Sequence, residues 1–159
     1  MIHPVKRDSS LEVVLSSVLP SACISRSERM VLASHSRPAS FRYFRTHEEH
    51  PAGQVGVAIA EWLFGLGWVL PAGGGYHIAP SGLVALHALG ARSQELATHT
   101  IYSFCTDETE GRHHLSGELG AALTEWLVGR EWAERAPENG MALTEAGYAG
   151  LTSLGVKLP

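Results

Sequence analysis

Long apolar runs and cysteines are scarce in this sequence, and each absence excludes a class of protein. No run of about eighteen apolar residues is present, and the opening MIHPVKRDSS leads into serine-interrupted sequence without a secretory apolar segment. The two cysteines, Cys23 and Cys105, are too few and too far apart for a disulfide framework or a CxxC zinc knuckle. We therefore expect a soluble, cytoplasmic protein with reduced thiols and no membrane partner.

The common catalytic motifs are also missing from the sequence. It contains no Walker loop, GxSxG elbow, HExxH helix or Gly-rich dinucleotide fingerprint. The GGG at residues 73–75 lies between two predicted strands and does not lead from a strand into a helix. The sequence therefore predicts a protein that is not an enzyme, and it indicates no particular cofactor.

Basic charge is concentrated at the N-terminal end of the chain. Residues 1–45 carry seven Lys and Arg against three acidic residues, whereas residues 46–159 carry five against thirteen. The helices predicted below, over residues 53–64 and 116–128, contain no Lys or Arg. DNA binding requires neutralisation of phosphates, so we expect DNA binding by this acidic part to be doubtful.

One phrase occurs twice in the sequence. AGQVGVAIAEWLFGLGW, residues 52–68, is echoed by SGELGAALTEWLVGREW, residues 116–132, and the matched positions include all four tryptophans. With one extra residue in the intervening turn, glycines and leucines of residues 75–90 align with those of residues 140–155. Such self-similarity predicts two pseudo-symmetric halves that bury each other's apolar surfaces.

Each copy has the pattern of a helix, a two-stranded wing and a second helix. Apolar residues at helical spacing predict the first helices, and the second of these stripes includes Leu115. Gly-containing turns at residues 71–75 and 136–140 separate short apolar segments, which is typical of hairpins. Further helices are expected to begin at Pro80 and after Thr144, a good N-cap.

The fold class predicted from these elements is α+β, with two pseudo-symmetric winged-helix-like lobes in one compact domain. The lobes span residues 41–92 and 93–159, and an N-terminal helix and linker occupy residues 1–40. The helix in that segment is expected over residues 11–19, LEVVLSSVL. Another short helix is expected to begin at Ser93 and to run toward the second copy.

Several of these residues resemble the C-terminal extension of a subgroup of ArsR-type transcriptional regulators. The resemblance is carried by CTDETEGRHHLSGELGAAL, residues 105–123, and by RTHEEHPAGQVGVAIAEWL, residues 45–63, and it covers about residues 42–157. Within residues 105–123, the positions that fit the extension's pattern are Cys105, Asp107, Thr109, Glu110, Arg112, His114, Gly117, Leu119 and Gly120. The resemblance implies transcription regulation through a ligand-sensing or dimerisation module, with a small molecule or a second copy as its partner.

The sequence departs from the family pattern at His47, where a cysteine is usual, at Glu108, where a tryptophan is usual, and at Gly111, where a basic residue is usual. The chain therefore retains one half of any thiol pair. About forty residues precede the repeat, and no helix-turn-helix is recognisable there. Two alternatives are an atypical DNA-binding regulator with a basic N-terminal segment, and a metal or metalloid sensor.

A ligand-binding cavity is one candidate site. Aromatic walls suit a planar or cationic ligand, although core packing is the more frequent use of tryptophan. His50 and His114 recur at equivalent points of the two copies, where they fill an interface or bind a ligand or metal. The candidate ligand-binding residues are Trp62, Trp68, Trp126, Trp132, His50 and His114.

A metal site is the second candidate. Cys105 lies near His99, Asp107, His113 and His114 in the sequence, although no HxxxH or CxxC spacing is present. We take Cys105 and His113 as candidate ligands and a purely structural role as the alternative.

Glycines at residues 53, 56, 117 and 120 place small residues one turn apart in the first helices. They predict that these two helices pack closely against each other.

Overall fold

The computed structural model describes residues 39–159, in which short antiparallel hairpins alternate with helices. In chain order the elements are α3 (Ala39–Tyr43), β1 (Arg45–His47), β2 (His50–Ala52), α4 (Gly53–Gly65), β3 (Val69–Ala72), β4 (Gly75–Ile78), α5 (Pro80–Leu89), β5 (Tyr102–Thr106), β6 (His113–Leu115), α6 (Gly117–Gly129), β7 (Ala133–Arg135), β8 (Met141–Leu143) and α7 (Glu145–Ser153). After α3, the order hairpin, helix, hairpin, helix occurs twice. The fold class is α+β, as predicted.

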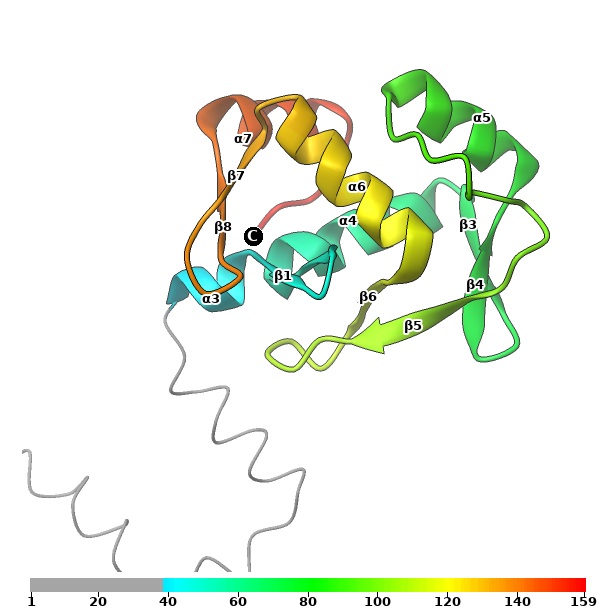
Figure 1. Cartoon of the computed structure of the whole chain (residues 1–159), viewed down its shortest axis with the longest axis horizontal. Helices are drawn as coiled ribbons and strands as arrows, with labels where there is room; N and C mark the ends of the chain where they lie inside the picture. Colours follow the sequence, from blue (N-terminus) through cyan, green and yellow to red (C-terminus); the bar gives the residue numbers. More distant parts are fainter. Residues whose placement is uncertain (1–38) are drawn as a thin grey trace, which may run out of the picture.

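The hairpins of the two halves join across the molecule. Strands β3, β4, β5 and β6 form one four-stranded sheet in that order. On the other side, a bridge between Arg45 and Gly140 places β1 beside β8, and the Thr46 amide donates a hydrogen bond to the Asn139 carbonyl at 2.8 Å. The β3–β4 and β7–β8 hairpins lie at opposite sides of the molecule, with α4 and α6 between them (Figure 1).

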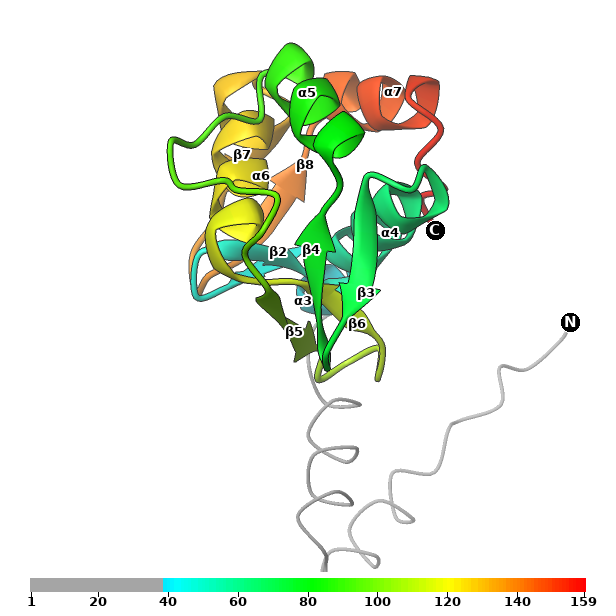
Figure 2. The same cartoon turned by 90° about the vertical axis from the view of Figure 1, so that its right-hand side faces the viewer.

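The helices also cross between the halves. Helix α4 packs on β6, and α6 packs on β2. The Trp62 indole N–H donates to the Leu154 carbonyl at 3.0 Å, and that of Trp126 donates to the Leu89 carbonyl at 3.0 Å. Helices α5 and α7 lie toward one end of the molecule, away from β5 and β6 (Figure 2). The halves therefore interlock, while their superposition as winged-helix-like lobes stays a prediction.

Most local signals in the sequence are confirmed. Helix α5 begins at Pro80, and α7 begins after Thr144, whose side chain accepts a hydrogen bond from the Gly147 amide at 2.9 Å. The β3–β4 turn contains Gly73 and Gly74 with φ of 54° and 83°, a left-handed conformation that glycine adopts readily. None of the helices in the described part of the chain is long and apolar enough to cross a membrane.

Three expectations are wrong. No helix begins at Ser93. Residues 91–101 form turns and irregular chain, and the next element is β5, which begins at Tyr102. Each half begins with a hairpin, β1–β2 or β5–β6, that the periodicity did not indicate. Leu115 accordingly ends a strand and does not belong to the helical stripe. The helix expected over residues 11–19 lies outside the described residues.

The glycines of the first helices also have another role than expected. Gly53 and Gly117 have φ of 77° and 68°, so they serve the sharp entry from hairpin to helix. A Cβ on Gly120 would lie 2.4 Å from the His50 Cβ, and one on Gly56 would lie 2.3 Å from the Pro51 carbonyl oxygen. The close approach is therefore between a helix and a hairpin, and not between the two helices as predicted.

Candidate metal centre

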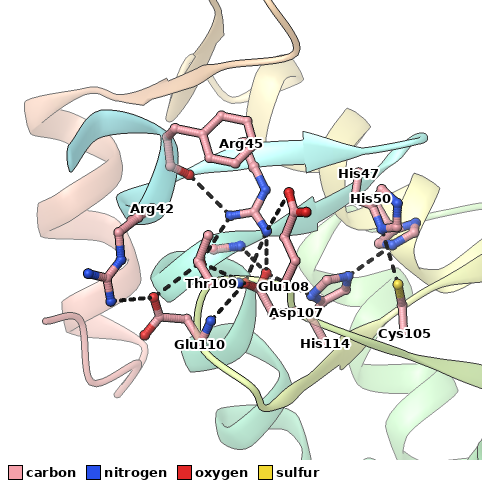
Figure 3. A network of polar contacts seen from close by, with 12 residues as sticks. Arg42, Arg45, His47, His50, Cys105, Asp107, Glu108, Thr109, Glu110 and His114 are labelled. Carbon is pink, nitrogen blue, oxygen red and sulfur yellow. Dashed lines mark hydrogen bonds and ion pairs between the residues drawn. The ribbon is translucent and has the colours of Figure 1, made fainter. Parts of the chain in front are cut away.

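Two hairpins bring together four side chains of types that can bind a metal ion. In β1–β2, His47 pairs with His50, and in β5–β6, Cys105 pairs with His114. One donor atom from each of these four side chains lies within 4.8 Å of the others. Each hairpin therefore contributes two donors, and the four side chains face one another (Figure 3).

The shortest contacts join one hairpin to the other. His47 Nδ1 lies 3.1 Å from Cys105 Sγ, and His50 Nε2 lies 3.0 Å from His114 Nε2. Zinc binds nitrogen at about 2.0–2.1 Å and thiolate sulfur at about 2.3 Å, so tetrahedral ligand atoms are about 3.3–3.6 Å apart. Small shifts of the rings would place a tetrahedral ion between these four atoms.

The cluster has a buried side and an open side. The side chains of His114 and His50 are 0% and 3% exposed, whereas His47 is exposed and Cys105 is half-buried. Glu48 and Glu49 form the turn beside His47. An ion can therefore reach the cluster from solvent past His47, and the acidic turn favours the approach of a cation.

Burial controls the protonation of the donors. Burial, followed by the neighbouring His114 and His47, lowers the pKa of His50 to about 4. His50 is therefore neutral at neutral pH, and a neutral imidazole has a lone pair for a metal. Burial also raises the pKa of Cys105, as do Glu48 and Asp107, while Arg45 opposes them. Metal binding at this thiol would release a proton.

Asp107 lies directly behind His114. Its Oδ2 accepts a hydrogen bond from the Gly53 amide at 2.6 Å and lies 3.2 Å from His114 Nδ1. The contact with His114 is a close approach of the ring nitrogen to the carboxylate, and it does not have the geometry of a hydrogen bond. Burial by itself would raise the pKa of Asp107, but the nearby His114 ring and the hydrogen bonds from Gly53 and Thr109 outweigh it and hold that pKa well below its usual range.

The second carboxylate oxygen is held by residues of its own loop. Oδ1 accepts from the amide and the hydroxyl of Thr109, at 2.9 Å and 2.7 Å, and from the Glu110 amide at 3.1 Å. Arg45 Nη2 lies 3.0 Å from both oxygens, and the Arg45 and Asp107 side chains are 3% and 0% exposed. This is a buried ion pair whose carboxylate is fully satisfied by hydrogen bonds.

The structure brings together only some of the residues that the sequence predicted. Cys105, His50 and His114 belong to the cluster, but His113 does not, because adjacent residues of a strand face opposite sides. His113 stacks on Phe104, with 4.8 Å between ring centroids. His47 was not among the predicted donors, although its place where the ArsR-type pattern usually has a cysteine was a signal.

The tryptophans lie in two separate pairs. The ring centroids of Trp62 and Trp68 are 5.5 Å apart, and those of Trp126 and Trp132 are 5.3 Å apart. Both pairs are in edge-to-face contact. Trp62 lines a depression of about 290 Å³, and Trp126 lines another of about 390 Å³. The pairs pack within the interlocked halves, and His50 and His114 line neither of these depressions.

Comparison with known proteins relates the chain to a transcriptional regulator. It is 28% identical over 108 residues to a protein of Bacillus subtilis (strain 168) named as the uncharacterized HTH-type transcriptional regulator YdfF. The match covers 66% of this chain and 48% of that protein, so the chain spans about half the length of this relative. No family model matches the chain, and no solved structure matches it.

Proposed function

We propose that this chain is a regulatory module of a transcriptional regulator and that its effector is a divalent transition-metal ion. The observation that carries the proposal is the convergence of His47, His50, Cys105 and His114 from two hairpins, with donor atoms within 4.8 Å of one another. The similarity to an HTH-type regulator supports the regulatory role. The proposal also fits the resemblance of the sequence to the C-terminal extension of ArsR-type regulators.

The donor set selects the class of ion. Three imidazoles and one thiolate are the ligands of zinc and of neighbouring ions such as cobalt, nickel and copper. Calcium and magnesium prefer oxygen ligands, which the cluster lacks. Four protein donors also fill a tetrahedral shell, so the ion would have no open position for a substrate. A closed site fits sensing or structural control better than catalysis.

The position of the cluster explains how an ion would act. Each hairpin supplies two donors, so an ion can bind all four only when β1–β2 and β5–β6 bring those donors close together. Metal binding therefore stabilises the conformation in which the two hairpins are close. All four donors come from one chain, so this proposal requires no second copy.

The other candidate effectors have less support. Trp62 and Trp126 line two different depressions, and neither is lined by His50 or His114, so neither depression gathers the predicted ligand-binding residues. Helices α4 and α6 carry no Lys or Arg, so DNA binding by this part of the chain stays doubtful.

Titration of the full chain with Co²⁺ tests the proposal. We expect the reduced, metal-free protein to bind one Co²⁺ with the strong visible absorption of a tetrahedral site and a thiolate charge-transfer band, and Zn²⁺ to displace it. Cys105→Ser should abolish the charge-transfer band, whereas Cys23→Ser should keep it. A wild-type chain that gives only weak octahedral absorption, or a band that depends on Cys23, would show that the proposal is wrong.

A further inference from the structure

We infer that Asp107 is the positioning residue of this metal site, and that residues 107–110 connect the occupancy of the site to the junction of α3 and β1. The inference rests on the metal binding proposed above and concerns its regulation. It starts from one juxtaposition: the carboxylate that faces His114 on one side faces Arg45 on the other (Figure 3).

The first step concerns the tautomer of His114. A carboxylate only accepts hydrogen bonds, so the 3.2 Å contact with Asp107 Oδ2 favours a proton on His114 Nδ1. The lone pair is then on Nε2, the atom that lies 3.0 Å from His50 Nε2 inside the cluster. A carboxylate behind a metal-binding histidine commonly fixes the ring and its tautomer in this way.

The second step is that this carboxylate is itself immobile. The Gly53 amide holds Oδ2 at 2.6 Å, and Arg45 contacts both oxygens at 3.0 Å. Gly53 begins α4, so Oδ2 lies at the positive end of a helix dipole. Asp107 can therefore orient His114 before an ion arrives, and this preorganisation raises the affinity of the site.

The third step follows the chain from the metal donors to the ion pair. His47 lies two residues after Arg45 in β1, and Cys105 lies two residues before Asp107. An ion would join His47 to Cys105, and the ion pair already joins Arg45 to Asp107. The two connections link the same two segments, so each one reduces the freedom that the other must restrict. Metal binding should therefore tighten the ion pair, and the ion pair should strengthen metal binding.

The last step leads to α3. Arg45 Nη1 donates to the Phe41 carbonyl at 3.1 Å, and its guanidinium lies 4.5 Å from the centre of the Phe41 ring. Arg42 forms an ion pair with Glu110 at 3.5 Å. Residues 107–110 therefore hold α3 directly through Glu110 and Arg42, and indirectly through Asp107 and Arg45. Helix α3 directly follows residues 1–38 in the sequence. A change in the contacts that hold α3 is therefore a change between those residues and the metal site.

The affinity test compares two changes at the same carboxylate. We expect Asp107→Asn to weaken Zn²⁺ binding, measured by chelator competition, by roughly 10–100-fold, the usual effect of losing such a partner. The thiolate band with Co²⁺ should persist, because all four donors remain. Thr109→Val is the comparison: it removes the hydroxyl that donates to Oδ1 and accepts from Arg45 Nη1, but it leaves Oδ2 facing His114, so Zn²⁺ affinity should fall clearly less than in Asp107→Asn. Equal weakening by both changes would show that Asp107 has only a structural role.

A measurement on the wild-type chain covers the case in which Asp107→Asn does not fold. Long-range proton–nitrogen NMR of the Zn²⁺ form should show a protonated Nδ1 and a metal-bound Nε2 for His114. A metal-bound Nδ1 would overturn the inference.

Amide exchange tests the connection to α3. Zn²⁺ should slow exchange of the Phe44 amide, which donates to the Ser40 carbonyl at 3.1 Å, in the wild-type chain and less so in Asp107→Asn. A wild-type chain that binds no metal would refute the proposed function. Normal metal binding with unchanged exchange of Phe44 would refute only the connection.

Discussion

The two hairpins of the proposed metal centre each carry two candidate donors, but they differ in what lies behind those side chains. In β1–β2, the turn at Glu48 and Glu49 leaves the His47 ring exposed. In β5–β6, the longer loop closes on itself through hydrogen bonds such as that from the Asp107 amide to the Arg112 carbonyl at 2.8 Å, and it places a carboxylate behind His114. One hairpin therefore mainly supplies donors, and the other also supplies their support.

This difference indicates where the site tolerates change. The support of His114 involves a buried ion pair and a helix N-terminus, so altering it affects folding and metal binding together. His47 is exposed, and it is the candidate donor that lies where the ArsR-type pattern, which the sequence resembles, usually has a cysteine. A donor at the open edge can change its chemistry without disturbing the core, whereas His114 and Asp107 cannot.

The largest effect on stability is expected from breaking the buried ion pair. Arg45→Met leaves the Asp107 carboxylate buried without its cation, which should lower the free energy of unfolding by about 3–5 kcal/mol. Arg135→Met breaks an exposed pair of 2.7 Å with Glu125 and should cost only about 0–1 kcal/mol. Urea denaturation of the metal-free proteins measures both values. Similar losses would mean that the longer loop gives no special support.

The next effect separates the two hairpins by metal affinity. His114→Ala removes the best supported donor, and its loss of Zn²⁺ affinity should exceed the roughly 100-fold upper range for an outer partner. His47→Ala should cause a smaller loss, because water can replace a donor at the open edge. His47→Cys should retain binding and strengthen the thiolate band with Co²⁺ under reducing conditions. If His47→Ala abolishes binding as completely as His114→Ala, the comparison of the hairpins fails.

The sequence predicted the fold best where single residues have strong local preferences. Pro80 and Thr144 mark helix starts, and Gly73 and Gly74 mark a turn, because each satisfies a specific backbone requirement. The hairpins of the metal centre were missed because β1, β2 and β6 have three residues each, too few for an alternating pattern. Pro51 within β2 further obscures the strand.

Only part of the candidate site was predictable from the sequence. The repeat identified His50 and His114 as equivalent positions, and the structure places their Nε2 atoms 3.0 Å apart. Recognising His47 required the pairing of β1 with β2, and rejecting His113 required knowing that residues 113–115 form a strand. Both depend on contacts between distant segments, which local patterns do not specify.

A smaller effect is expected where a helix meets the first hairpin. A Cβ on Gly120 would lie 2.4 Å from the His50 Cβ and 2.5 Å from the Leu115 carbonyl oxygen, so Gly120→Ala must displace one of them. The cost should be about 1–3 kcal/mol, together with weaker Co²⁺ binding. Gly129→Ala is the control, because its Cβ would meet nothing within 4 Å. Thermal melts and Co²⁺ titrations of both variants measure these effects. If Gly120→Ala melts and binds Co²⁺ like the wild-type chain, the close packing of Gly120 against His50 is wrong.

The smallest effect tests whether the two halves are equally supported away from the metal centre. Trp62→Phe removes the hydrogen bond to the Leu154 carbonyl, for which no second side-chain donor is found in residues 39–159, and should cost about 1 kcal/mol beyond the lost ring area. Trp126→Phe removes the equivalent bond to the Leu89 carbonyl, but Arg130 Nη2 also donates to that oxygen at 2.9 Å.

Because the Leu89 carbonyl keeps a partner, Trp126→Phe should cost less than Trp62→Phe in urea denaturation. Adding Arg130→Met should raise the cost of Trp126→Phe to that of Trp62→Phe, since both carbonyls then lack a side-chain donor. A larger loss for Trp126→Phe alone would show that Arg130 does not share this role and that the tryptophans of the two halves differ for another reason.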